Sequence, residues 1–498
     1  MEPESGPKRV PAGASPFEFP LNLPSRDSRN LLRELHRQLR TAILDGRLAP
    51  GLRLPATRAF ADACGISRNT AVAAYDLLLS EGYLVTRRKA GTYVADALPR
   101  AATRPPVARA GGHGDPRLNT YWRAQSLPAY EPMPVPKPHD FQFGVPEKRF
   151  FRFDIWQRLS GRALRALSRA PAIYSDAQGR VALREAIAAH VAFARAVACR
   201  PDDVIVTAGA QQAFDLLARI LVTSGHTTVA IENPGYPPMR AAFALAGARM
   251  VPVPVDDEGL VVERLPADAR VVCVTPSHQF PLGTAMSMRR RAALLDFART
   301  HGAVIVEDDY DGEFRLGARP LDALQTLDRS GSVFYVGTFS KSLLPSLRLG
   351  YVVAPPWAQP ALIALKQRTE WHTAMPAQDA LAAFIAEGHL ARHVRKMRDV
   401  YGQRRRVLLE TLQRDFDGLL EPIASDAGLH LSAFAHIGRR DVDRLLQRTF
   451  ERGVRFEALA GYSVGAGARS GIGFGYGGVD EAGIREGLAV LREVWRAG

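Results

Sequence analysis

The sequence predicts a multidomain chain in which a small, mainly helical N-terminal domain precedes a large α/β domain. Its 498 residues exceed the length of one ordinary domain. Prolines recur throughout residues 97–139 with little apolar periodicity, which is typical of an extended linker. After this stretch, strand-like and helix-like segments alternate, as they do in α/β domains. We therefore expect an N-terminal extension over residues 1–27, the small domain over 28–96, the linker over 97–139 and the large domain over 140–498.

Composition narrows the class of protein. The formal net charge of +14 and the pI of about 10.0 make a polyanionic partner plausible, although composition alone does not distinguish DNA from RNA or from a charge that serves solubility. The cysteines Cys64, Cys199 and Cys273 lack metal-ligand spacing, so we expect neither a disulfide framework nor a metal site. The N-terminal residues lack the apolar run of a signal peptide, and no apolar stretch has membrane-spanning length. We therefore expect a cytoplasmic protein without a membrane partner.

Three helices are expected in the small domain. Apolar residues at helical spacing predict a first amphipathic helix that ends at Gly46, namely Leu31, Leu35, Leu39 and Ile43. Residues 57–78 then contain a short helix, a turn at Gly65 and a second helix with Ser67 as its expected N-cap. This is a helix-turn-helix, in which the start of the second helix can reach phosphates and base edges of DNA. The residues expected there are Ser67, Arg68, Asn69 and Thr70.

A basic hairpin is expected after the helix-turn-helix. Residues 87–94 are typical of a two-stranded wing, from which Arg87, Arg88 and Lys89 would meet the DNA backbone or the minor groove. An ordinary helical hairpin with a solvated charged turn is the alternative for the helix-turn-helix taken alone. The helix and loop, the helix-turn-helix and the wing occur in the correct order, which favours a DNA-binding domain.

The small domain resembles the winged-helix domain of GntR-type bacterial regulators over about residues 28–95. The resemblance rests on Pro50-Gly-Leu-Arg-Leu-Pro-Ala-Thr-Arg58, Gly65-Ile-Ser-Arg-Asn-Thr70, Ala74-Tyr-Asp-Leu-Leu78 and Glu81-Gly-Tyr83. It implies that Arg58, Arg68 and Thr70 contact a double-stranded DNA operator and that Gly91 is a structural element of the wing.

In the large domain, residues 337–351 deliver one lysine and one arginine from a small-polar turn in apolar surroundings. An amine becomes a nucleophile when its pocket lowers its pKa, so Lys341 can form a Schiff base with an aldehyde cofactor. Arg348 and nearby hydroxyls can hold a phosphate. Pyridoxal phosphate (PLP) is the cofactor that needs both. A lysine on a surface loop between two strands is the alternative for this motif taken alone.

Two further segments offer contacts to such a cofactor. Residues 204–217 pass from a strand to a helix through Gly209, and the amides of Gly209, Ala210 and Gln211 at the helix N-terminus can cradle the phosphate opposite Arg348. Residues 228–236 end a strand with Tyr236 in a loop, where a planar ring can stack on it. The alternatives are a plain strand-to-helix connection and a core tyrosine.

A third segment carries carboxylates. Residues 303–310 predict a buried strand whose carboxyl end presents Asp308 and Tyr310, and open α/β sheets bind ligands at that end. A carboxylate against the pyridine nitrogen of PLP keeps that nitrogen protonated, and a nearby phenol can hydrogen-bond the ring oxygen. Acidic residues after a strand also occur in solvated loops and helix caps, which is the alternative here.

Together these segments resemble the fold type I aminotransferases, and the domain order resembles the MocR/GabR subfamily of GntR regulators. The likeness rests on the lysine motif and on Tyr174-Ser-Asp-Ala-Gln-Gly179, Asn233-Pro-Gly-Tyr236, Thr275-Pro-Ser-His-Gln-Phe-Pro-Leu-Gly283 and Glu307-Asp-Asp-Tyr-Asp-Gly-Glu-Phe314. It implies a multidomain fold class: an N-terminal α+β winged helix-turn-helix, and a large α/β PLP-dependent transferase domain of aminotransferase fold type I with a smaller C-terminal α+β subdomain.

The resemblance also implies roles for single residues. Lys341 would be the catalytic lysine that forms the internal aldimine, Asp308 would pair with the pyridine nitrogen, Tyr310 would contact the ring hydroxyl and Tyr236 would stack. The residues around the phosphate would be Gly209, Ala210, Gln211, Thr338, Ser340 and Arg348. Tyr174 would reach the phosphate site of the other subunit, because such domains bind PLP at the interface of a homodimer. This homodimer can also be domain-swapped.

Two departures from the enzymes stand out. Phe280 occupies the position of an asparagine that contacts the cofactor ring oxygen, and His278 is the candidate to compensate. Gly471 occupies the position of the arginine that grips the substrate α-carboxylate, and Arg469 is the nearest substitute and therefore the candidate effector contact. Both changes weaken the case for efficient transamination, whereas neither affects the lysine, aspartate or phosphate elements.

The sequence therefore predicts a PLP-dependent, DNA-binding transcriptional regulator. It would sense a small-molecule amine, amino acid or B6 vitamer through a Lys341 aldimine. One alternative is an active PLP-dependent aminotransferase that carries a DNA-binding appendage. Another is a DNA-binding protein whose large domain is a dimerisation scaffold without cofactor, against which the intact Asp308, Lys341 and Arg348 argue.

Overall fold

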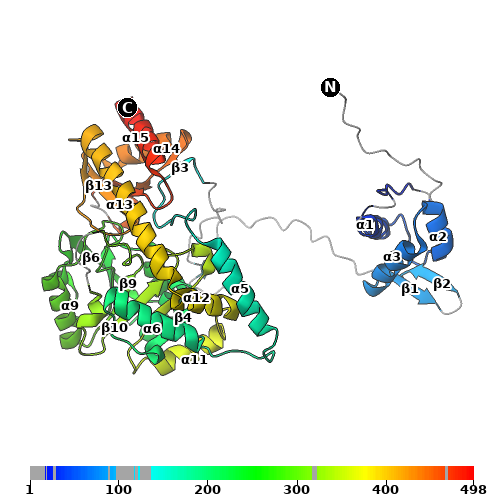
Figure 1. The fold of residues 1–498 in the computed structure, drawn as a ribbon, viewed down its shortest axis with the longest axis horizontal. Coiled ribbons are helices and arrows are strands. Elements are labelled where there is room, and N and C mark those ends of the chain that lie inside the picture. Colours follow the sequence, from blue (N-terminus) through cyan, green and yellow to red (C-terminus); the bar gives the residue numbers. More distant parts are fainter. Residues whose placement is uncertain are drawn as a thin grey trace. The chain divides into compact units, whose positions relative to one another are not determined.

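The computed structural model describes residues 17, 19–25, 28, 30–87, 90–96, 117, 122–123, 136–316, 322–465 and 469–497. The chain divides into two compact units, Met1–Glu131 and Pro132–Gly498 (Figure 1). Most of the expected N-terminal extension and of the expected linker lies outside the described residues. Within the described part of the chain, no helix is both long enough and apolar enough to cross a membrane.

The N-terminal unit combines three helices with a two-stranded hairpin. The helices are α1 (Leu31–Leu44), α2 (Thr57–Cys64) and α3 (Arg68–Ser80), and the strands are β1 (Leu84–Arg87) and β2 (Gly91–Val94). The strands pair antiparallel, with Leu84 opposite Val94. The apolar stripe of α1 is buried in one cluster with Phe60 and Leu78, as its helical spacing predicts. The predicted winged helix-turn-helix is confirmed.

Local sequence explains the turn between α2 and α3. Gly65 ends α2 in the left-handed region at a φ of 63°, which glycine adopts without steric cost. Ser67 caps α3, because its Oγ accepts a hydrogen bond of 3.1 Å from the backbone N–H of Thr70. The loop between α2 and α3 therefore leaves the N-terminal end of α3 exposed to solvent.

An eight-stranded sheet forms the framework of the C-terminal unit (Figure 1). Its strands lie in the order β4 (Val204–Thr207), β11 (Gly350–Val353), β10 (Val333–Thr338), β9 (Val304–Asp309), β8 (Ala269–Val274), β5 (Thr228–Asn233), β6 (Arg249–Asp256) and β7 (Gly259–Leu260). The strands from β10 to β6 run parallel, and β11 is antiparallel to both of its neighbours. Parallel strands that are covered on both faces read as continuous apolar runs, which explains the sequence pattern.

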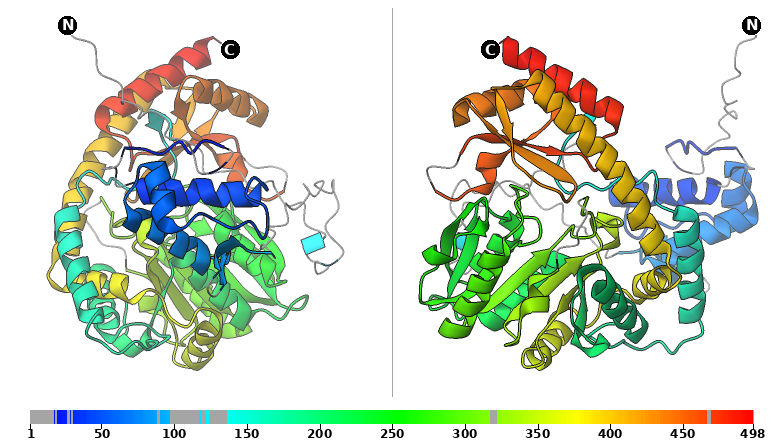
Figure 2. Two further views of the ribbon diagram at one scale, coloured as in Figure 1. Left: turned by 90° about the vertical axis from the view of Figure 1, so that its right-hand side faces the viewer. Right: turned by 60° about the vertical axis from the view of Figure 1, so that its left-hand side comes forward.

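Helices cover both faces of this sheet (Figure 2). One face packs against α7 (Ala210–Leu221), α8 (Pro237–Leu245) and α11 (Gln359–Thr369). The other face packs against α6 (Val181–Arg195), α9 (Met288–His301) and α12 (Met375–Ala386). Helix α5 (Phe153–Leu167) packs on α12, and α10 (Leu324–Leu327) contacts β10. Short 3₁₀ helices span Pro201–Asp203, Val262–Arg264, Pro345–Leu347 and Leu459–Tyr462.

A smaller subdomain completes the C-terminal unit. Its antiparallel sheet has the order β12 (Leu420–Pro422), β13 (His430–Ala435), β16 (Gly471–Gly475) and β15 (Glu457–Ala458). Its helices are α13 (His389–Asp415), α14 (Arg439–Glu451) and α15 (Glu481–Arg496). Strand β3 (His139–Asp140) pairs with β14 (Val454–Arg455), and this pairing holds residues 141–144 against the subdomain. The predicted α/β domain with a smaller α+β subdomain is confirmed.

Two adjacent leucines of α3 test the packing of the N-terminal unit. The side chain of Leu78 is fully buried, whereas Leu77 is 41% exposed. We expect Leu78→Ala to lower the free energy of unfolding of this unit by about 2 to 5 kcal/mol, because the substitution leaves a cavity. We expect Leu77→Ala to change it by less than about 0.5 kcal/mol. Amide hydrogen exchange of α1 and α3 in the full-length protein measures both effects, and equal exchange in the two variants would contradict the packing.

Candidate functional site

A cavity of about 450 Å³ lies in the C-terminal unit, where β9 and β10 end and where α7 and α8 begin. Ligands bind at this edge of open α/β sheets, because the loops that follow the strands surround a crevice there. The predicted residues that line the cavity are Ala210, Gln211, Tyr236, Asp308, Tyr310, Thr338, Ser340, Lys341 and Arg348. Other lining residues come from distant segments, among them Phe143, Gly144, Phe280, Glu457 and Tyr462.

Lys341 follows β10 and points into this cavity. Its Nζ donates a hydrogen bond of 2.9 Å to the carbonyl oxygen of Gly144. Burial lowers the pKa of Lys341, and the carboxylates of Asp311 and Asp308 partly offset this effect. A lowered pKa makes more of the neutral amine available as a nucleophile. The φ of +70° at Gly144 favours glycine, and a Cβ there would lie 2.3 Å from Nζ of Lys341, so a side chain at this position would displace the lysine amine.

Asp308 is a buried carboxylate without a full set of partners. Its side chain is 2% exposed, and its Oδ1 has no hydrogen-bond partner among the described residues. Burial raises the pKa of Asp308 well above its ordinary value, and the neighbouring carboxylates of Asp309 and Asp311 raise it further. Buried polar atoms are almost always paired in proteins, so this oxygen fits a donor on a ligand, such as the N–H of a protonated pyridine ring.

The first turn of α7 and Arg348 form an anion site. Gly209 is the N-cap of α7, and a Cβ on it would lie 3.0 Å from the guanidinium of Arg348. That guanidinium donates a hydrogen bond of 2.8 Å to the carbonyl oxygen of Ala208. The hydroxyls of Thr338 and Ser340 lie 3.0 Å from each other on the same cavity wall. Helix N–H groups, a guanidinium and hydroxyls together suit a phosphate.

Aromatic side chains form much of the remaining wall. The Tyr310 hydroxyl lies 2.9 Å from Nδ1 of His278, and burial raises the pKa of Tyr310 well above its ordinary value. His278 is not among the lining residues, so it contacts the cavity only through Tyr310. The ring of Tyr236 packs edge-on against Phe280 at 5.1 Å between centroids, and burial raises the pKa of Tyr236 to about 12.

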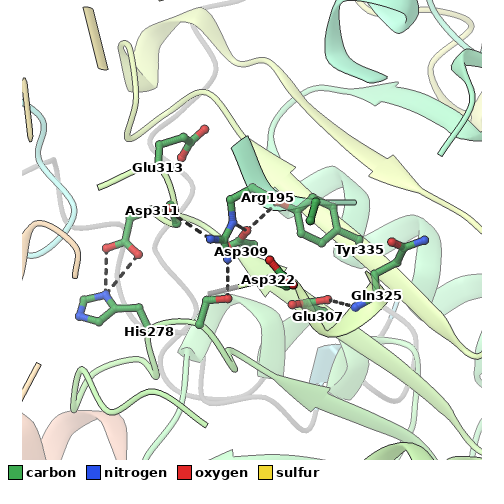
Figure 3. A network of polar contacts seen from close by, with 12 residues as sticks. Arg195, His278, Glu307, Asp309, Asp311, Glu313, Asp322, Gln325 and Tyr335 are labelled. Atoms are coloured by element: carbon green, nitrogen blue, oxygen red, sulfur yellow. Dashed lines mark hydrogen bonds and ion pairs between the residues drawn. The ribbon is translucent and has the colours of Figure 1, made fainter. Parts of the chain in front are cut away.

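A buried polar network surrounds Asp309, the residue after Asp308 (Figure 3). The Nε of Arg195 donates to Oδ2 of Asp309 at 2.6 Å, and the Tyr335 hydroxyl donates to the same oxygen at 2.6 Å. Burial raises the pKa of Glu307 to about 7, although the backbone N–H groups of Leu324 and Gln325 donate to its carboxylate. We did not predict this network. The sequence did contain a signal for this network, namely the alternation of side chains along a strand, because Glu307 and Asp309 must face away from Asp308.

Besides His278 and Gly209, which support the cavity without lining it, the predicted residues Tyr174 and Arg469 also lie outside the cavity wall. Tyr174 is 69% exposed and stacks on Trp371 with ring centroids 4.3 Å apart. Arg469 is exposed, where its Nη2 lies 3.2 Å from Oε2 of Glu421 and its guanidinium lies over the ring of Phe434. A contact of Tyr174 with a second subunit and a contact of Arg469 with an effector both stay predictions.

At Gly471, where the resemblance to the aminotransferases predicts the substrate arginine, there is no space for a side chain. A Cβ on Gly471 would lie 2.6 Å from the carbonyl oxygen of Ala433 and 2.6 Å from Cδ1 of Leu459. Among the described residues that line the cavity, the cations are Lys341 and Arg348. The described wall therefore offers a carboxylate ligand no cation beyond those that suit an aldehyde and a phosphate.

The N-terminal unit presents the predicted DNA contacts on its surface. Arg58, Ser67, Arg68 and Asn69 are exposed, and Thr70 is partly exposed beside the Ser67 hydroxyl. Arg87 forms an exposed ion pair with Asp96 and lies over the ring of Tyr93. Gly91 has a φ of +115° and packs against Arg53, which explains the glycine in the wing. The predicted contacts Arg88 and Lys89 lie outside the described residues.

Family models match both units. The model described as bacterial regulatory proteins, gntR family, matches residues 31–94. The model described as aminotransferase class I and II matches residues 154–434. The probable rhizopine catabolism regulatory protein MocR of Rhizobium meliloti is 39% identical over 469 residues, which are 93% of this chain and 94% of that protein.

Further relatives support both the predicted regulator and the predicted cofactor. The HTH-type pyridoxine biosynthesis transcriptional regulator PdxR of Corynebacterium glutamicum is 31% identical over 477 residues, 96% of this chain and 98% of that protein. The crystal structure of LysN, an α-aminoadipate aminotransferase from Thermus thermophilus complexed with N-(5'-phosphopyridoxyl)-L-leucine, is 28% identical. It covers 72% of this chain and 92% of its own, with a TM-score of 0.66. The fold and this complex support pyridoxal phosphate as the cofactor.

Asp308 and Asp309 give a matched test of the site. Because the folded state raises the pKa of Asp308, ionisation of this group destabilises the fold as the pH rises above about 4. We expect Asp308→Asn to raise the melting temperature of the cofactor-free protein at pH 8 and to raise it less at pH 5, since asparagine does not titrate. With PLP added, the variant should bind the cofactor more weakly than the wild type, because the ring nitrogen loses its partner.

The neighbouring substitution serves as the control. Asp309→Asn removes the carboxylate charge that pairs with buried Arg195, so it should destabilise the protein by about 3 to 5 kcal/mol. Thermal unfolding at the two pH values, with and without PLP, measures both variants. A destabilised Asp308→Asn protein without cofactor would contradict the account of an unpaired buried carboxylate.

Proposed function

The chain belongs to the GntR-type regulators that carry an aminotransferase class I and II domain, and we propose that it regulates transcription by sensing a small molecule at the Lys341 site. The sensed molecule is an amine, an amino acid or a B6 vitamer. One combination of features carries this proposal. The lysine, the aspartate and the phosphate-binding side chains that we assign to PLP line one cavity. A side chain at Gly471, where the resemblance predicts a substrate-binding arginine, has no space. Such a site retains the cofactor and disfavours rapid transamination.

Each cavity residue has a defined task in this proposal. PLP supplies an aldehyde that reacts with amines. Lys341 is the amine to which the cofactor attaches, with loss of one water, and its lowered pKa keeps it reactive. Asp308 accepts a hydrogen bond from the pyridine nitrogen. Arg348 and the N-terminus of α7 hold the phosphate, and Tyr310 contacts the ring oxygen with support from His278.

The winged helix-turn-helix supports binding to double-stranded DNA. We propose that this binding takes place in the cytoplasm. Helix α3 is the recognition helix, and its exposed first turn carries Arg68 and Asn69 toward base edges or phosphates. The wing supplies a further backbone contact through Arg87. We propose a homodimer, in which Tyr174 reaches the phosphate site of the second subunit and two recognition helices read two half-sites.

Sensing requires that the effector binds one arrangement of the protein more tightly than another. An effector that binds both arrangements equally leaves DNA affinity unchanged, whatever its own affinity. The proposal therefore predicts a reciprocal effect, in which operator DNA changes effector affinity by the same factor.

An active aminotransferase with a DNA-binding appendage is the second candidate, because Lys341, Asp308 and Arg348 are all in place. Sustained turnover of an amino donor and a keto acid by the purified protein would favour the enzyme. A single stoichiometric reaction with the donor, without turnover, would favour the sensor.

Arg68 tests the placement of the recognition helix. We expect Arg68→Ala to weaken binding to the intergenic DNA beside the gene of this protein by about 1 to 3 kcal/mol, or about 5- to 150-fold in Kd. Arg37→Ala is the matched control, because Arg37 is an exposed arginine of α1 that pairs with Glu34 in the same unit. Fluorescence anisotropy with the PLP-loaded protein measures both variants. Equal loss of affinity in the two variants would contradict the placement.

A further inference from the structure

The C-terminal subdomain contributes an acid and an aromatic ring to the cavity wall. Glu457 lies on β15, and Tyr462 ends the 3₁₀ helix that follows it. Phe143 lies in the segment after β3, and Phe280 lies in the loop after β8. None of these four residues belongs to the contacts proposed for PLP, so this part of the wall is left for the effector.

Glu457 is a carboxylate that lacks a cationic partner. Its Oε2 accepts a hydrogen bond of 2.9 Å from the Tyr462 hydroxyl. Among the described residues, no lysine, arginine or histidine nitrogen lies within 4.0 Å of its carboxylate, and the nearby Arg455 pairs with Asp140 instead. Burial raises the pKa of Glu457 above its ordinary value, and the hydrogen bonds from Tyr462 and from the Phe143 backbone and the more distant charge of Arg455 offset this effect only in part. A carboxylate can accept about four hydrogen bonds, so it has capacity for a ligand donor.

Aromatic rings surround the space beside Glu457. The ring centroid of Tyr462 lies 5.1 Å from that of Phe280 and 5.7 Å from that of Phe143. Phe143 reaches this position because Gly473 has no side chain, since a Cβ there would lie 2.0 Å from the Phe143 ring. The faces of aromatic rings attract cations, and a carboxylate nearby strengthens this preference.

The same wall disfavours a carboxylate on the effector. Under the proposed function, Lys341 and Arg348 serve the aldehyde and the phosphate of PLP, and they are the cations among the described lining residues. Gly471 leaves no space for another, and Arg469 lies outside the wall beside Glu421. A carboxylate placed beside Glu457 would meet a like charge in a partly buried site.

We propose that Glu457, with Tyr462, Phe143 and Phe280, binds a positively charged group of the effector, so that the effector class is an amine with a second cationic group and no carboxylate. This inference rests on the proposed function, because it assigns one amine of the effector to the cofactor and the other to Glu457. It narrows the effector class from amines, amino acids and vitamers to diamines and related polyamines.

Three probes of equal chain length test the proposal. These are 1,4-diaminobutane, butylamine and 4-aminobutanoate, whose far ends are cationic, neutral and anionic. Calorimetric titration of the PLP-loaded, full-length protein should give a Kd for the diamine about 10-fold or more below that for butylamine, because a hydrogen bond to a charged group contributes about 1.5 to 3 kcal/mol. The Kd for 4-aminobutanoate should be the highest of the three.

Glu457→Gln should bring the Kd values of the diamine and butylamine within about 3-fold of each other, since glutamine keeps the shape and loses the charge. Glu493→Gln is the matched control, because Glu493 is an exposed glutamate of the same subdomain that pairs with Arg452. This control should keep the preference for the diamine. The visible absorption band of bound PLP shows that each variant is folded and loaded.

The absorption band also distinguishes failure of the proposed function from failure of this inference. A wild-type protein that binds no PLP would overturn the proposed function and this inference together. A loaded protein that binds 4-aminobutanoate as tightly as the diamine would overturn this inference alone. A Glu457→Gln protein that retains the full preference would do the same.

Discussion

The burial of Asp308 at the end of β9 is the constraint around which the site is arranged. Asp308 and Asp309 are neighbours on one strand, so their side chains face opposite sides of the sheet. Asp309 pairs with Arg195 and Tyr335 inside the protein, whereas Asp308 retains an oxygen without a partner among the described residues. The ion pair on one side holds the strand, and the unpaired carboxylate on the other side is available to a ligand.

Sheet register places the lysine beside this carboxylate. Val336 of β10 lies opposite Asp308, and Gly337 lies opposite Asp309. A Cβ on Gly337 would lie 2.3 Å from the Tyr351 hydroxyl, so the glycine leaves room for the side chain of Tyr351, its pairing partner on β11. Lys341 leaves the sheet just beyond this point. The subdomain completes the cavity with Glu457 and Tyr462. A ligand that contacts both Lys341 and Glu457 would bridge the large sheet and the subdomain. Such a ligand can bind one arrangement of these two parts more tightly than another, as sensing requires.

Local patterns were sufficient to predict the residues that follow strands. The buried run before Asp308, the glycine turn into α7 and the small-polar turn around Lys341 each gave a contact that now lines or supports one cavity. Phe143, Gly144, Glu457 and Tyr462 gave no such signal, because segments far apart in the chain meet only through the β3–β14 pairing and the subdomain sheet. Arg469 was chosen by proximity in sequence to Gly471, and the structure places its side chain against Glu421 and Phe434.

The visible absorption spectrum of the protein with PLP shows whether Lys341 holds the cofactor in this cavity. Purified protein with PLP should show a lysine-dependent absorption band, and Lys341→Ala should lack it while retaining the same far-ultraviolet circular dichroism. Addition of an amine that is sensed should shift the band of the wild type. A wild-type spectrum equal to that of Lys341→Ala at saturating PLP would contradict the account and leave a DNA-binding protein with a cofactor-free scaffold.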